Sequence, residues 1–265
     1  MYIGDLTLED VIYDFLESIN SLKDLFILKG CYALKYHIKD LNKFRNTKDI
    51  DFHCFCKEDW LEFIEKFEKV SFLNSRLGLS YTLVKRRGFD KNPNSDRLTI
   101  EARFHEQIVE TFTIDMNVGD VVDFDVLDNG LRYYSLVSIL ADKLHVLQSI
   151  KICRRIKDFI DIYCIATHFD FELNYLINKI KDRFMFTNRE FVSMNELFFL
   201  DQENVLKMKH AYEKYSCDIK FDVSFDEAYD IVFGFAGIIL SSCVEDEFNY
   251  SFRWNHKKRL WDDNN

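Results

Sequence analysis

Proline and glycine are scarce in this sequence, with one proline and eight glycines among 265 residues. This scarcity excludes a disordered linker or a low-complexity tract and favours long regular elements. Cysteine is also sparse, and its seven residues are an odd number with no Cys-x-x-Cys pair. The pattern fits a reducing compartment better than a disulfide framework, so we expect a cytoplasmic protein.

Long apolar runs are missing as well. The best candidate, Ile231–Leu240, is shorter than the roughly 20 residues that cross a bilayer, so we expect no membrane contact. The N-terminal stretch 1–10 carries acidic residues and has no apolar core, which argues against a signal peptide. Neither a Gly-Lys-Ser/Thr phosphate loop nor a Gly-x-Gly-x-x-Gly turn occurs, which excludes the P-loop and Rossmann classes at the level of sequence.

Positive charge is in deficit, and the formal net charge is −10. A protein that follows nucleic acid over its whole surface is normally basic, so an RNA substrate would have to meet a local basic patch. Lys85, Arg86 and Arg87 are one candidate, although we favour the start of an exposed loop there. A basic and aromatic tail is another; its composition suits stacking on single-stranded RNA, yet we favour a last helix docked by its aromatic residues. The tail residues are Phe252, Arg253, Trp254, Lys257, Lys258, Arg259 and Trp261.

Apolar residues are plentiful at 48%, and 26 Phe with 13 Tyr supply ample material for a core. Up to about residue 120, helices alternate with short strands, beginning with a helix that Thr7 can cap and that runs to about Ile19. From Tyr133 onward the apolar residues recur at helical spacing. We therefore predict an α+β fold, with residues 1–130 an α/β domain around a small mixed sheet and residues 131–265 a helical bundle domain.

Residues 26–55 contain the strongest candidates for a functional site. An apolar run leads to Gly30, which permits a tight turn, and a helix can start at Cys31; free N–H groups at a helix start bind phosphate. The strand that follows carries Asp49 and Asp51, which alternation places on one face. Two neighbouring carboxylates repel each other, and a divalent cation such as Mg²⁺ relieves that repulsion. The stretch therefore predicts phosphoryl or nucleotidyl transfer from a nucleoside triphosphate.

Two motifs in this stretch, Leu28-Lys29-Gly30 and Arg45-x-Thr47-x-Asp49-Ile50-Asp51, resemble the AbiEii/AbiGii-type toxin family of nucleotidyltransferases in the polymerase-beta-like superfamily. The resemblance implies a polymerase-beta-like fold for the first domain and Mg²⁺, or Mn²⁺, as the cofactor. It also implies a set of nucleotide-binding residues, namely Lys29, Gly30, Cys31, Arg45 and Thr47. Cys31 departs from the family, which usually has Gly or Ser at this place, and cysteine is a poorer hydrogen-bond donor than serine.

The superfamily uses three carboxylates, two on the Asp-x-Asp strand and a third on a neighbouring strand that shares the metal and helps to deprotonate the attacking hydroxyl. Asp115 is our candidate for the third, since it ends an alternating strand whose apolar residues would face the core. Asp120, Asp123 and Asp125 are weaker candidates, because their segment reads as a solvated loop. With the strand pair above, Asp115 completes the expected set of metal ligands and catalytic acids.

The helical half contains a second set of candidate residues. The sequence around Ala141 and Lys143, and the segment 154–163, resemble the later motifs of the family, an A-x-K-L helix and an R-x-K-D-x-x-D helix. The resemblance implies that Lys143 reaches the triphosphate and that Asp158 orients this lysine or assists in the site. Without the resemblance, acids and bases spaced by four residues in this segment would indicate an ordinary salt-bridged helix surface.

A zinc site at His53, Cys54 and Cys56 is disfavoured, since alternation puts both cysteines on the core face and no second pair has finger spacing. We predict a Mg²⁺-dependent nucleotidyltransferase that moves a nucleoside monophosphate from an NTP to an acceptor hydroxyl. The resemblance to the family implies that the protein is the toxin of a bacterial toxin–antitoxin or phage-defence pair. It also implies an antitoxin protein as partner and RNA, such as tRNA, as acceptor. Two alternatives stay open: transfer to a small molecule or a protein, and NTP binding without turnover.

Overall fold

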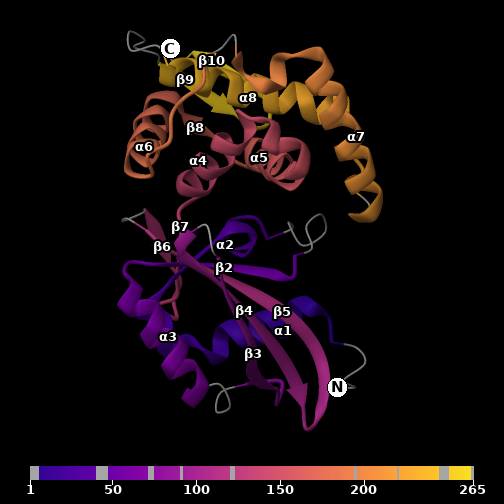
Figure 1. The fold of residues 1–265 in the computed structure, drawn as a ribbon. Coiled ribbons are helices and arrows are strands. Elements are labelled where there is room, and N and C mark those ends of the chain that lie inside the picture. The colour runs from indigo at the N-terminus through magenta and orange to yellow at the C-terminus, as the bar shows by residue number, and fades with distance from the viewer. Residues whose placement is uncertain are drawn as a thin grey trace. The chain divides into compact units, whose positions relative to one another are not determined.

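The structure is a computed structural model, and it describes residues 6–39, 47–70, 75–89, 92–119, 123–193, 196–219, 221–244 and 251–263 (Figure 1). These residues form two compact units. The first unit contains residues 6–36 and 47–135, and the second contains residues 37–39 and those from 136 onward. The division between Ser135 and Leu136 lies a few residues beyond the boundary that we predicted at 130.

In the described part of the first unit, seven strands form one mixed sheet in the order β3-β4-β5-β2-β1-β7-β6. The strands are β1 (Ile27–Lys29), β2 (Asp49–Cys54), β3 (Ser80–Phe89), β4 (Asn92–Phe104), β5 (Gln107–Val118), β6 (Phe124–Val126) and β7 (Arg132–Tyr134). β2 runs parallel to β5 and β1 runs parallel to β7, whereas the other neighbours are antiparallel. The prediction of an α+β fold with a mixed sheet is confirmed.

The helices of this unit are α1 (Leu8–Ser18), α2 (Gly30–His37) and α3 (Lys57–Val70), with a 3₁₀ helix, η2 (Asn20–Leu25). Aromatic rings join α1 and α3 to one face of the sheet, since Phe15 packs edge-on against Phe112 at 5.0 Å and Phe63 against Phe52 at 5.6 Å between ring centroids. Thr7 caps α1 through a reciprocal pair of hydrogen bonds with Asp10. The sheet therefore buries one face beneath helices, and its alternate side chains project from the other.

One strand is longer than the sequence analysis predicts. We placed Lys85, Arg86 and Arg87 at the start of a loop, but β3 continues to Phe89 and pairs with β4 through all three residues. The prediction of a loop is wrong because β4 starts as early as Asn92, which gives this polar stretch a partner strand for its backbone hydrogen bonds.

The second unit is mainly helical. Its helices are α4 (Leu136–Leu147), α5 (Ile156–His168), α6 (Leu173–Phe186), α7 (Gln202–Ile219) and α8 (Phe225–Val244), with 3₁₀ helices η4 (Ile150–Arg154) and η6 (Phe198–Leu200). Among the described residues, α8 alone is long and apolar enough to span a membrane by length and composition, but 56% of its apolar window is buried inside the protein. Phe235 of α8 lies 5.0 Å from Trp254 between ring centroids, so α8 is a core helix of this unit.

The chain ends in strands where we predicted a last helix, and that prediction is wrong. Strands β8 (Phe171–Glu172), β9 (Phe252–Asn255) and β10 (Leu260–Asp263) form a small sheet in the order β10-β9-β8. The predicted docking by aromatic residues is nevertheless present: Trp254 is 1% exposed and donates its indole N–H to the Ala166 carbonyl at 2.7 Å. Trp261 stacks on Phe235 at 5.9 Å between ring centroids. The second unit is therefore a helical unit with an added hairpin.

Candidate active site

Three acids of the first unit lie on two neighbouring strands. β2 and β5 are parallel, and Asp51 is the register partner of Asp115, as Asp49 is of Thr113. Residues paired across a sheet project from the same face, so the three acids share the face opposite the aromatic core. Asp49 is exposed, whereas Asp51 and Asp115 are partly buried. Negative charge is thus gathered at one place on the face of the sheet opposite α1 and α3.

Hydrogen bonds fix the beginning of the acidic strand. Thr113 Oγ1 donates to Asp49 Oδ1 at 2.5 Å, across the β2–β5 pair. Thr47 Oγ1 accepts from the Asp49 backbone N–H at 3.2 Å, and the Tyr32 hydroxyl of α2 donates to the Thr47 carbonyl at 3.2 Å. These contacts make Thr47 an anchor for Asp49, and a direct contact between Thr47 and a nucleotide stays a prediction.

Arg97 on β4 is the cation of the acidic group. Its Nε and Nη2 atoms donate to Asp115 Oδ1 and Oδ2, each at 2.6 Å, which is the bidentate geometry that a guanidinium and a carboxylate favour. The pKa of Arg97 is raised, chiefly by these hydrogen bonds to Asp115 and further by the charges of Asp115, Asp49 and Asp51. Arg97 therefore lies in the electrostatic field of all three acids.

Gly30 brings the start of α2 against the acidic strand. Its φ angle is +66°, a conformation that glycine adopts at little cost. A Cβ atom at this position would lie 2.2 Å from Asp51 Oδ2, closer than atoms can approach. Asp51 therefore lies beside the first turn of α2, where unpaired backbone N–H groups and the helix dipole favour negative charge.

The other predicted nucleotide-binding residues lie around this turn. Lys29, at the end of β1, is the register partner of Asp51, so its Cα lies next to the acidic group. Cys31 lies in the first turn of α2 and is 5% exposed, so a direct contact between its thiol and a nucleotide stays a prediction. Arg45 lies outside the described residues, as does Asp120. Asp125 lies on β6 and is exposed, so the loop predicted there is wrong at this residue.

The acidic group supplies part of the ligand set that a divalent cation requires. Asp49 and Asp51 supply hard oxygen donors from one face of β2, and Mg²⁺ commonly takes one or two carboxylates and completes its shell with phosphate oxygens and water. Within the described residues, no three His, Cys, Asp or Glu side chains stand close enough together to hold a metal. Asp115 stands apart in that both its oxygens accept from Arg97. The β2 pair therefore suits a metal that arrives with a nucleotide.

The second unit contains a buried charge cluster around Lys143. Its Nζ lies 3.1 Å from Asp158 Oδ1 and 2.5 Å from Asp161 Oδ2. Lys143 and Asp158 are each 5% exposed, and Asp161 is fully buried. Arg155, whose side chain is exposed, lies with its Nε 2.7 Å from Asp158 Oδ2. An exposed salt-bridged helix surface, the alternative from the sequence, does not describe Asp158 or Asp161. Asp158 contacts Lys143 as the motif implies, and a role for either residue in transfer stays a prediction.

Two residues of these clusters were missed as site candidates in the sequence. Arg97 follows the alternation of β4 onto the polar face, but which acid it meets depends on strand register, which the sequence does not reveal. Asp161 was visible only as one half of a four-residue spacing with Lys157. In the structure Lys157 instead lies over the ring of Tyr215, at 5.3 Å from the centroid.

Comparisons with known proteins bear on the family and the fold of the chain. Residues 14–231 match the model of a family described as nucleotidyl transferase AbiEii toxin, of type IV toxin–antitoxin systems. A crystal structure described as a presumed nucleotidyltransferase from H. pylori resembles the chain with a TM-score of 0.53 and 16% sequence identity, covering 94% of this chain and 100% of the other. At that identity the likeness concerns the fold. No protein with a curated description matches the chain.

Proposed function

The chain belongs to the AbiEii family of nucleotidyltransferase toxins, and from this premise we propose that it transfers a nucleoside monophosphate from an NTP to a hydroxyl of RNA, with Mg²⁺ or Mn²⁺ as cofactor. The observation that carries the proposal is the pairing of Asp51 with Asp115 beside the start of α2. Acids that can hold a cation, next to backbone groups that can hold phosphate, are what transfer of a charged nucleotidyl group requires.

Asp49 and Asp51 are the residues that would hold the metal. A bound ion would offset the charge of the phosphates and polarise the phosphoryl oxygen. Gly30 leaves room for the Asp51 carboxylate. The N–H groups of the first turn of α2 would bind the phosphates of the nucleotide. Thr113 and Thr47 keep Asp49 oriented on β2.

In the transfer step, the acceptor oxygen forms a bond to the α-phosphorus of the NTP. The bond from that phosphorus to the oxygen bridging to the β-phosphate breaks, and its electron pair leaves with pyrophosphate. The hydroxyl proton passes to a carboxylate, for which Asp115 is our candidate, since each of its oxygens keeps a second lone pair beside the contact with Arg97. The setting is a toxin–antitoxin pair in the cytoplasm, with the antitoxin as a protein partner.

Incubation of the protein with labelled NTPs, Mg²⁺ and total RNA tests the proposal. We expect label on RNA, and its loss in the double variant Asp49→Asn, Asp51→Asn. The matched control is Asp125→Asn, an exposed acid on β6 of the same unit, which should keep transfer. Transfer that survives in the double variant contradicts the metal assignment. Label on a small molecule or a protein, or NTP binding without transfer, supports one of the two alternatives instead.

A further inference from the structure

A β-bulge in β3 turns two basic side chains onto the face that carries the acids. Before the bulge, Leu83 pairs with Ile100 of β4, a residue of the aromatic core. The register then shifts between Leu83 and Lys85, so that Lys85 pairs with Thr99. In an unbroken strand Lys85 would share the face of Leu83, but the extra residue reverses the alternation beyond it. Bulges that re-aim side chains in this way are common next to active sites.

Arg86 shows that the alternation has reversed. It pairs in register with Leu98, a core residue, and its Nε donates to the buried carboxylate of Asp96. Its guanidinium also lies over the ring of Trp60 on α3, at 5.3 Å from the centroid. Arg86 is therefore directed to the helix-covered face, which leaves its neighbours Lys85 and Arg87 on the opposite face.

Strand pairing continues from these two residues to the acids. Arg87 is the partner of Arg97, Arg97 of Asp115, and Asp115 of Asp51. At about 4.8 Å between strands, the Cα of Arg87 is about 10 Å from Asp115 and about 15 Å from Asp51. The next row runs from Lys85 through Thr99 and Thr113 to Asp49 and adds two hydroxyl groups. We call Lys85 and Arg87 the β3 basic pair.

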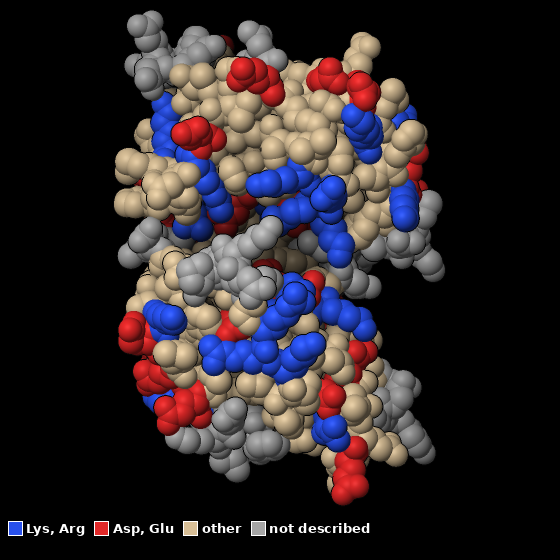
Figure 2. All heavy atoms as spheres, in the orientation of Figure 1, with Lys and Arg blue, Asp and Glu red and all other residues tan. Residues whose placement is uncertain are grey.

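Both residues of the β3 basic pair project their charge to solvent. Lys85 and Arg87 are exposed, and no carboxylate of the described residues forms an ion pair with either. Arg97 and Arg86, by contrast, pair with Asp115 and Asp96. Figure 2 shows Lys and Arg side chains gathered over the sheet of the first unit. Exposed cations without partners are the local basic patch that an acidic protein needs in order to meet a polyanion.

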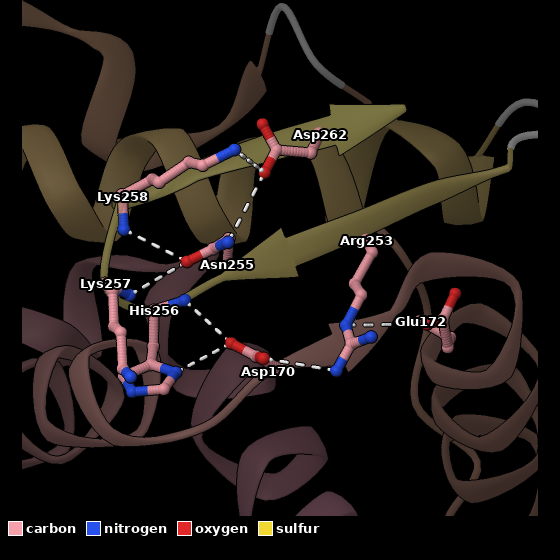
Figure 3. Close-up of polar contacts among 8 residues, drawn as sticks. All are labelled: Asp170, Glu172, Arg253, Asn255, His256, Lys257, Lys258 and Asp262. Atoms are coloured by element: carbon pink, nitrogen blue, oxygen red, sulfur yellow. Dashed lines mark hydrogen bonds and ion pairs between the residues drawn. The ribbon is translucent and has the colours of Figure 1, made fainter. Parts of the chain in front are cut away.

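The basic tail, the other candidate for such a surface, is largely neutralised. Arg253 contacts Asp170 at 3.2 Å and Glu172 at 3.7 Å, and Lys258 contacts Asp262 at 2.8 Å (Figure 3). Arg259 contacts Glu227 at 2.8 Å. These charges serve to hold the C-terminal hairpin, so the observations favour β3 over the tail.

We propose that the β3 basic pair binds the phosphodiester backbone of the RNA acceptor, upstream of the hydroxyl that reacts. This inference rests on the proposed function and adds where the acceptor lies. With the reacting end at Asp115 and Asp51, the roughly 10 to 15 Å to Arg87 corresponds to about three or four stacked nucleotides at 3.4 Å each. Thr99 and Thr113 line the same path with hydroxyl groups, which commonly contact phosphate.

Binding of a fluorescein-labelled, 12-nucleotide single-stranded RNA of mixed sequence tests the inference. Fluorescence anisotropy across a series of salt concentrations gives the slope of log K against log salt. Each phosphate contact contributes about 0.7 to that slope for a single strand, so Lys85→Ala with Arg87→Ala should reduce its magnitude by about 1.4. The measurement is made in the Asp49→Asn, Asp51→Asn background, where no transfer is needed for a result.

The matched control is Lys57→Ala with Lys66→Ala on α3, which removes the same charge on the helix-covered side of the sheet. It should leave the slope unchanged, and thermal melting checks that both double variants fold. The inference is overturned if the β3 variant keeps the slope of the wild type. It is also overturned if the β3 variant loses affinity for a polyglutamate peptide but keeps its affinity for the RNA. If RNA binding depends on the β3 basic pair but the wild type transfers no nucleotide to RNA, the proposed function is wrong. The assignment of the β3 basic pair as an RNA-binding surface is then still supported.

Discussion

The guanidinium of Arg97 donates to both carboxylate oxygens of Asp115, at 2.6 Å for each contact. Asp115 is in turn the partner of Asp51 on the parallel strand β2. A charge-assisted, bidentate pair of this kind is among the stronger polar contacts in proteins. Any metal ion that binds Asp115 therefore competes with Arg97, or shares the carboxylate with it, for the same oxygens.

Replacement of Arg97 by alanine should therefore tighten metal binding, because it removes a positive charge beside Asp49 and Asp51 and frees Asp115 to share the ion. A hydrogen bond to a charged group contributes about 1.5–3 kcal/mol, and about 1.4 kcal/mol corresponds to a tenfold change in affinity. We expect Arg97→Ala to lower the dissociation constant for Mn²⁺ at least about tenfold, measured by electron paramagnetic resonance. Arg103→Ala, which removes an arginine of the same strand that pairs with Glu101, is the control. Unchanged or weaker Mn²⁺ binding in Arg97→Ala would rule out competition between the two cations.

Gly30→Ala should damage the site as well as the fold. The left-handed backbone costs a residue with a Cβ about 1–2 kcal/mol, and here the Cβ would also displace the Asp51 carboxylate. Gly78 is the matched control, since its φ angle is +70° but its Cβ would meet only Phe104, at 3.8 Å. Urea denaturation should show a loss for both variants, whereas Mn²⁺ affinity should fall only in Gly30→Ala. Equal Mn²⁺ affinity in the two variants would contradict the role that we assign to Gly30.

Much of the candidate site could be read from the sequence because its signals are local. Alternation alone places Asp49 and Asp51 on one face, and Gly30 marks the turn that its positive φ angle requires. Thr7 marks the start of α1 by the capping chemistry of the residue itself. These features depend on neighbours within a few positions along the chain, so they needed no knowledge of strand order.

Features that depend on register could not be predicted in the same way. The contact between Arg97 and Asp115 spans eighteen positions and exists only because β4 pairs with β5 in one register. The bulge after Leu83 reverses the faces of Lys85 and Arg87, and no turn residue announces it in the sequence. Similarly, the four-residue spacing that suggests a surface ion pair at Asp158 gives no sign that this residue is buried against Lys143.

Lys143→Met should strongly destabilise the second unit. The change leaves Asp158 and Asp161 buried without the ammonium group between them, and breaking a buried ion pair from one side costs about 3–5 kcal/mol. The triple variant Lys143→Met, Asp158→Asn, Asp161→Asn removes the uncompensated charges and should recover part of the loss, measured by urea denaturation. A triple variant that folds but transfers no nucleotide supports the predicted role of Lys143 toward the triphosphate. Recovery of both stability and transfer would limit Lys143 to a structural role.

Asp170 should make the anchoring of the C-terminal hairpin depend on pH. Its Oδ1 accepts from the backbone N–H of His256 at 2.9 Å and contacts the imidazole Nδ1 at 2.7 Å, while Oδ2 accepts from Arg253 (Figure 3). The pKa of Asp170 is lowered, mainly by the backbone hydrogen bond from His256 and next by its side chain. Because the folded pKa lies below the unfolded value of about 3.9, the stabilisation is complete well above that value and is lost as the pH falls through the folded pKa.

The stability difference between the wild type and Asp170→Asn should therefore shrink as the pH falls below about pH 4. Urea denaturation at a series of pH values measures that difference, with tryptophan fluorescence as the signal because Trp254 and Trp261 lie in the hairpin. Arg253→Met serves as the comparison, since it weakens the same anchor but leaves the His256 contacts in place, so its difference from the wild type should also fall at low pH. The stability difference between the wild type and Asp170→Asn could instead be as large at pH 3 as at pH 7. That result would show that the Asp170 carboxylate does not hold the hairpin through its charge.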